Sequence, residues 1–109
     1  MINSAEYSPA NRMWFVLSVH RKTQDGLVYI CGTIKMPTGG KGALLYGADG
    51  PVRVWVNGKP AGCQPKATNP IVLDQYRAAA TWKKGRNEIL FDLDTNKGQA
   101  WGVCARGER

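Results

Sequence analysis

The sequence predicts an all-β protein, an antiparallel β-sandwich or jelly roll of about eight strands. Three observations lead to this prediction. Short runs of β-branched and aromatic residues recur along the chain, clusters of glycine, proline, asparagine and aspartate separate them, and no segment has a clear helical period. The runs recur roughly every 8–14 residues, which is the spacing of strands in sandwiches and barrels.

Length and composition indicate a single domain. The chain has 109 residues, of which 43% are hydrophobic, so one core is expected over residues 1–109. That content excludes wholesale disorder. No apolar run approaches the roughly 20 residues of a membrane-spanning helix. Residues 1–12 lack the basic and then apolar pattern of a signal peptide.

The first half of the chain holds three predicted strands. Residues 14–19 are aromatic and β-branched and contain neither glycine nor proline. Asp25-Gly26 then predicts a turn into a second strand at residues 27–34, which Pro37 closes. A short strand is expected at residues 43–46.

The middle of the chain contains the strongest turn signal. Residues 52–56 (Val-Arg-Val-Trp-Val) predict a strand, and Asn57-Gly58 after it predicts a tight hairpin. Residues 59–70 hold three prolines and are expected to be a long loop. Residues 72–82 stay open between a strand and an irregular segment, since Ala78-Ala79-Ala80 weakly favours helix.

The last third predicts two strands. Gly85 supplies a turn, and Asn87 beside it can cap that turn through its side chain. Residues 88–93 alternate clearly, with Ile89, Phe91 and Leu93 on one face. A polar loop at residues 94–98 precedes a final strand at residues 101–105.

The cysteines do not predict a metal site. The chain has three cysteines and one histidine, without a CxxC pair, which argues against structural zinc. Cys31 and Cys104 lie in apolar runs and are expected to be buried free thiols, although a disulfide between one pair stays open. No cofactor is expected. Calcium is the alternative, with ligands drawn from Asp49, Asp74, Asp92 and Asp94.

The strand at residues 52–56 predicts a binding surface. Its three valines share one face and suit the core, so Arg53 and Trp55 are expected on the outer face or in a groove. An indole offers an apolar plane for a sugar ring or a nucleobase, and a guanidinium offers donors for hydroxyls, carboxylates or phosphates. A neighbouring loop over Trp55 is the alternative.

Three segments together resemble galactose-binding-like β-sandwich domains, which occur as carbohydrate-binding modules and as accessory domains of glycoside hydrolases. They are the hairpin Val54-Trp55-Val56-Asn57-Gly58-Lys59, the turn and strand of residues 82–90 (WKKGRNEIL), and residues 98–103 (GQAWGV). The resemblance covers residues 13–106. Trp82, where the family usually has an aliphatic residue, and the alanines at 78–80 depart from it.

Candidate ligand residues fall into two groups, because modules of this resemblance bind sugars either on a sheet face or in loops at one end. The sheet-face group combines planar and basic side chains. The loop group consists of hydrogen-bonding residues that also suit turns. The first group is Arg53, Trp55, Tyr76 and Trp82; the second is Asn69, Asp94 and Asn96; Trp101 is a core or rim residue that could contact ligand.

Catalysis is not expected. Glu88 and Asp92 share a strand face, but four residues separate their backbones by about 13 Å, more than a retaining glycosidase allows. Ser18 and His20 share a strand face without a third group for a triad.

The resemblance implies a non-catalytic carbohydrate-binding module from a larger, bacterial carbohydrate-active enzyme, secreted or at the cell surface as part of that enzyme. Its expected partners are a polysaccharide or oligosaccharide and a catalytic domain of the parent chain. The net charge of +7 favours an acidic polymer. A membrane is not expected as a partner.

Two alternatives stay open. One is a structural sandwich domain that packs on a catalytic domain and binds no ligand of its own. The other is a single-stranded nucleic-acid-binding domain, which the basic and aromatic residues permit. The 15 basic residues are scattered, however, and no RNA-binding motif or zinc finger is present.

Overall fold

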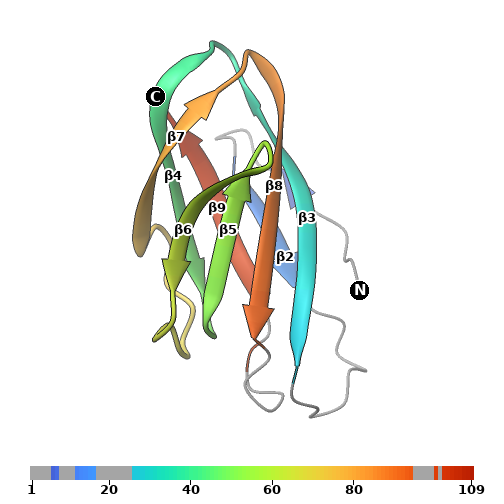
Figure 1. Cartoon of the computed structure of the whole chain (residues 1–109), viewed down its shortest axis with the longest axis vertical. Helices are drawn as coiled ribbons and strands as arrows, with labels where there is room; N and C mark the ends of the chain where they lie inside the picture. Colours follow the sequence, from blue (N-terminus) through green and yellow to red (C-terminus); the bar gives the residue numbers. More distant parts are fainter. Residues whose placement is uncertain (1–5, 8–11, 17–25, 95–99, 101) are drawn as a thin grey trace.

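The computed structural model describes residues 6–7, 12–16, 26–94, 100 and 102–109. Within them the chain forms nine strands and no helix, packed as two antiparallel sheets, so the predicted all-β sandwich is confirmed (Figure 1). The described part of the chain contains no helix long and apolar enough to cross a membrane. The strands are β1 (Glu6–Tyr7), β2 (Arg12–Val16), β3 (Leu27–Met36), β4 (Gly40–Ala48), β5 (Val52–Val56), β6 (Lys59–Gln64), β7 (Tyr76–Trp82), β8 (Gly85–Asp94) and β9 (Gly102–Glu108).

The strand order is that of a jelly roll. One sheet has the order β1-β2-β9-β4-β7 and the other β3-β8-β5-β6. From the central hairpin outward, β5 pairs with β6, β4 with β7, β3 with β8 and β2 with β9, each antiparallel. Successive pairs alternate between the sheets, so one long folded hairpin is wound into a sandwich.

The core lies between the two sheets and follows the predicted alternation. Val52, Val54 and Val56 of β5 are buried, as are Phe91 of β8 and its neighbours at positions 89 and 93. The Tyr46 ring of β4 lies 6.2 Å from the Phe91 ring, centroid to centroid. Each such side chain contributes about 1.5–3 kcal/mol to stability by leaving water.

A fully buried asparagine, Asn87, joins two turns at one end of the sandwich. Asn87 Oδ1 accepts hydrogen bonds from the Lys83 backbone amide and from Asn57 Nδ2, each 2.9 Å. Its Nδ2 donates to the carbonyl oxygens of Lys83 at 2.9 Å and Gly85 at 3.0 Å. The predicted capping of the turn by Asn87 is therefore confirmed, and the same side chain also holds the β5–β6 hairpin.

One segment differs from the prediction, and the structure decides a second segment that the sequence left open. Residues 59–70 were expected to be a loop, but residues 59–64 form β6. Because β6 is the edge strand of its sheet, it tolerates Pro60, which lies next to a shift in its register with β5. The open segment at 72–82 contains β7, whose pairing along β4 outweighs the weak helix preference of its alanines.

The cysteines divide by the face on which they lie. Cys104 is buried as predicted, whereas Cys31 and Cys63 are exposed, and none of the three forms a disulfide. The prediction for Cys31 was wrong because it occupies the outward position of β3, between the buried Ile30 and the next inward residue. An apolar run in sequence does not reveal which alternate residues face solvent.

The outer face of the five-stranded sheet is partly covered by the connection at residues 65–75. A Cβ atom at Gly47 would collide with the Val72 carbonyl oxygen, which shows how closely this segment approaches β4. Arg106 Nε of β9 donates to Asp74 Oδ2 at 2.9 Å and ties the segment to the sheet. Of the exposed large apolar side chains among the described residues, Leu27 and Tyr29 lie on β3 of the four-stranded sheet, and Val72 and Leu73 lie on this connection.

Candidate functional site

The candidate site is the outer face of the four-stranded sheet. The cross-strand register places two rows of outward side chains next to each other. In one row Tyr29 lies opposite Asp92, and Asp92 opposite Arg53. In the next row Cys31 lies opposite Leu90, and Leu90 opposite Trp55.

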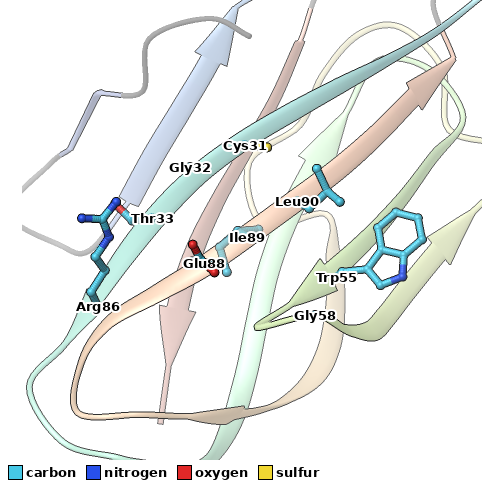
Figure 2. Close-up of a pocket in the computed structure, with 9 residues that line it drawn as sticks. All are labelled: Cys31, Gly32, Thr33, Trp55, Gly58, Arg86, Glu88, Ile89 and Leu90. Carbon is cyan, nitrogen blue, oxygen red and sulfur yellow. The ribbon is translucent and has the colours of Figure 1, made fainter. Parts of the chain in front are cut away.

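The second row forms the floor of a hollow of about 630 Å³ (Figure 2). Leu90 lies between Cys31 and Trp55 in that row, and the Trp55 indole is half-buried at its edge, where Figure 2 shows it standing apart from the other side chains. The hollow is therefore apolar near Trp55 and polar toward the start of β8, where Arg86 and Glu88 lie. Its lining residues are Cys31, Gly32, Thr33, Trp55, Gly58, Arg86, Glu88, Ile89 and Leu90.

Arg53 is held in place beside Trp55. Its Nε donates to Asp92 Oδ2 at 3.2 Å, and its Nη2 donates to the same oxygen. The guanidinium carbon lies 5.5 Å from the centroid of the Trp55 ring, within cation–π distance. One carboxylate oxygen thus fixes the guanidinium over the indole ring, while 55% of the Arg53 side chain stays exposed.

Arg53 and Asp92 form an ion pair in which the guanidinium is exposed and the carboxylate is buried. The hydrogen bond and charge of Asp92 raise the pKa of Arg53 above its ordinary value, so Arg53 is charged throughout the working pH range. The Asp92 side chain is 1% exposed, and its Oδ1 has no hydrogen-bond partner among the described residues. Because Asp92 neutralises Arg53, this part of the face presents donors without a net charge.

The structure brings together two of the predicted sheet-face residues, Arg53 and Trp55, on the outer face where the alternation of β5 placed them. Tyr76 and Trp82 lie on β7 of the other sheet, so the prediction that all four share one face was wrong. The physical reason is topological: β7 pairs with β4, and consecutive β6 and β7 belong to different sheets.

Tyr76 and Trp82 also point inward. Trp82 is 2% exposed, and its Nε1 donates to the Glu108 carbonyl oxygen at 3.0 Å. The Tyr76 ring lies 5.4 Å from the Tyr46 ring, centroid to centroid, and packs against the core. A buried indole cannot stack on a ligand from solvent, so Trp82 is a core residue.

Of the loop candidates, Asp94 lies on this face, opposite Leu27 and in a smaller hollow with Arg53 and Asp92, whereas Asn69 lies apart from it. Asn69 is exposed in the connection between β6 and β7, and Asp94 is the partly buried last residue of β8. Asp94 follows Asp92 on β8, and its backbone amide donates to the Pro51 carbonyl oxygen at 2.9 Å. Asn96 and the Trp101 side chain lie outside the described residues.

Sequence reasoning missed the contribution of β3 and β8 to the face. Tyr29 is 49% exposed and Leu27 is 54% exposed, and neither was a candidate. The alternation of Leu27, Tyr29 and Cys31 against buried residues was the available signal. This signal was obscured because the outward and the inward residues of β3 are both largely apolar, so the segment resembles one continuous buried run.

The described residues provide little for metal or acid–base chemistry. Among residues 26–94, 100 and 102–109, no three His, Cys, Asp or Glu side chains are grouped to hold a metal ion. Glu88 and Asp92 share the outer face, as predicted, but the Asp92 carboxylate is buried under Arg53. The arrangement suits binding by stacking and hydrogen bonding.

Comparisons with known proteins agree on the fold. The chain matches no protein-family model and no curated protein sequence. Its structure is similar to part of a β-glucosidase from Kluyveromyces marxianus, with a TM-score of 0.57 and 14% identity over 78% of this chain and 11% of that enzyme. It is also similar to part of a GH31 α-xylosidase from Xanthomonas citri, with a TM-score of 0.52 and 15% identity over 93% of this chain and 10% of that enzyme.

The chain corresponds to only a small region of each of these two enzymes. It spans about a tenth of the length of each one. At 14–15% identity the likeness shows the fold alone. A sandwich of this size is therefore a small part of each of two larger carbohydrate-active enzymes.

Proposed function

We propose that this domain is a non-catalytic carbohydrate-binding module of a larger carbohydrate-active enzyme, with its site on the outer face of the four-stranded sheet. The observation that carries the proposal is the arrangement of Trp55 and Arg53. A half-buried indole stands at the edge of an apolar floor, and an adjacent guanidinium is fixed against it by a buried carboxylate.

This arrangement suits a sugar ring. The C–H face of a pyranose packs on an indole plane and excludes water from it. Arg53 supplies donors that Asp92 does not use, directed at ring hydroxyls on the exposed side. A floor of apolar groups with a few placed polar groups is the usual composition of a small-ligand site.

Two further points support the proposal. The structurally similar regions belong to a β-glucosidase and an α-xylosidase, both of which act on carbohydrates by their names. The three segments at residues 54–59, 82–90 and 98–103 favour a galactose-binding-like accessory domain within the jelly-roll class. A parent enzyme of this kind works on polymers outside the cell, so we place the domain there with it.

Affinity electrophoresis tests the proposal. The native domain is run in gels containing xylan, xyloglucan, β-glucan or polygalacturonate, and retardation in at least one is expected. Trp55→Ala should weaken retention about tenfold or more, because it removes the stacking surface. Leu73→Ala is the matched control: it truncates another exposed side chain, on the connection between β6 and β7.

One observation favours a second candidate, a structural domain that packs on a catalytic neighbour. Leu27 and Tyr29 expose apolar surface on the same face, as an interdomain contact would. The same gels decide between the two. If no polysaccharide retards the native domain, the packing role replaces the binding role; retention lost in Trp55→Ala and kept in Leu73→Ala supports binding.

A further inference from the structure

Unpaired basic side chains gather at one end of the sandwich. The last register pairs of β3 with β8 and of β4 with β7 lie there, beside the β7–β8 turn. The β5–β6 hairpin reaches the same end through the hydrogen bond from the Asn57 amide to the Glu88 carbonyl oxygen (Figure 1). We define the basic end by its exposed residues Lys35, Lys41, Lys59, Lys83, Lys84 and Arg86.

The strand register places two of these charges face to face. Lys35 of β3 lies directly opposite Arg86 of β8, and both side chains are exposed. Like charges at opposite positions of an antiparallel pair destabilise a sheet. Packing and folding therefore do not explain this pair, whereas an anionic ligand across both side chains would.

Ion pairs among the described residues do not neutralise these six side chains, although one exposed carboxylate, that of Glu88, lines the same hollow as Arg86. In the described part of the chain, none of the six residues forms an ion pair with an acidic residue. Arg53, Arg77 and Arg106, by contrast, each pair with a carboxylate. Glu108 accepts from Arg77 Nη1 at 2.7 Å. The positive potential of this end is therefore available to a partner.

We infer that the basic end binds the carboxylate or sulfate groups of an acidic polysaccharide whose sugar rings contact Trp55. The inference deepens the proposed function and rests on it for the identity of the polymer as a glycan. Arg86 lines the hollow that also holds Trp55, so one chain can extend from the indole to the basic residues (Figure 2).

A glycan fits this end better than a single-stranded nucleic acid does. Binding of single strands combines phosphate contacts with aromatic rings on which bases stack. Trp82, the aromatic residue of the adjoining β7 end, is buried in the core. Among the described residues, the hollow that reaches this end is lined by a single aromatic ring, that of Trp55, whereas a run of stacked bases requires several rings.

The test compares one polymer with and without its charge. Retention is measured in gels containing polygalacturonate or its methyl ester, across a series of salt concentrations. The native domain should bind the acid more tightly than the ester, with an advantage that falls as salt rises. Lys35→Gln/Lys84→Gln should weaken binding to the acid about fivefold and leave binding to the ester unchanged.

A matched variant controls for net charge. Lys66→Gln/Arg77→Gln lowers the net charge from +7 by the same two units as Lys35→Gln/Lys84→Gln, at positions away from the basic end. Equal weakening by both double variants would overturn the inference, because the effect would then follow total charge. Tighter binding to an oligo-dT strand than to polygalacturonate would overturn it as well.

The outcomes separate this inference from the proposed function. Trp55→Ala should reduce retention by the acid and the ester alike, because both present the same sugar rings. If the ester and other neutral polymers never bind and Trp55→Ala has no effect, the proposed function fails. If Trp55 matters but the acid has no salt-sensitive advantage over the ester, only the inference on the basic end fails.

Discussion

Asn57 donates its side-chain amide to Asn87 Oδ1 at 2.9 Å, and the Glu88 backbone amide donates to Asn57 Oδ1 at 2.9 Å. Asn57 itself has a φ of 50°, which the hairpin turn requires. Two segments that carry the resemblance in sequence, residues 54–59 and 82–90, therefore meet at this contact. Their asparagines hold the turns that present Trp55; they are structural rather than ligand-binding residues.

Asn87→Ala should lower the free energy of unfolding by about 2–4 kcal/mol, because backbone groups of the β7–β8 turn lose their buried partners. Urea denaturation followed by tryptophan fluorescence measures this change. Gln75→Ala, an exposed position, is the control and should change stability by about 0.5 kcal/mol or less. A loss below about 1 kcal/mol for Asn87→Ala would show that water replaces these bonds without cost.

Tyr46 should make stability fall at alkaline pH. Burial raises the pKa of its hydroxyl above 10.0, so the unfolded state loses this proton first as pH rises. The contribution of Tyr46 to the free energy of unfolding is then fully present below about pH 10. Above that pH it declines by at most about 1.4 kcal/mol per pH unit. Denaturation midpoints across pH 9–11 measure the decline, and Tyr46→Phe should flatten it. An equal decline in Tyr46→Phe would assign it to other groups.

Arg53 and Asp92 should act as a pair in ligand binding. Asp92→Asn removes the charge that fixes the guanidinium beside Trp55, so Arg53 should become a less effective donor. We expect Asp92→Asn to weaken polysaccharide binding in the same direction as Arg53→Gln. The double variant should be no weaker than Arg53→Gln alone, which affinity electrophoresis of the three variants measures. Additive losses would mean that Asp92 acts independently of Arg53.

The three thiols should differ in reactivity. Cys31 and Cys63 are exposed on the four-stranded sheet and should react with Ellman's reagent in the native domain, whereas Cys104 is buried and should react only after unfolding. Two fast thiols in buffer and three in guanidinium chloride are expected. Cys31→Ser and Cys63→Ser should each remove one fast thiol. A native protein with one or no reactive thiol would contradict the placement of β3 and β6.

The sequence by itself determined the strand alternation, the hairpin at Asn57-Gly58 and the inward or outward side of each residue in β5 and at positions 88–93 of β8. These features are local, because a period of two residues and a turn that needs positive φ are encoded within a few positions. The outward placement of Arg53 and Trp55 followed from them. The fold class also followed, from the spacing of the turns.

Only the tertiary structure decided which strands lie side by side. The pairing of β3 with β8 joins residues 49–67 positions apart and places Tyr29, Cys31 and Leu90 beside Trp55 and Arg53. The pairing of β7 with β4 removes Tyr76 and Trp82 from that face and buries Trp82. Long-range pairing depends on how both sheets fill one core, and no short window of sequence contains that information.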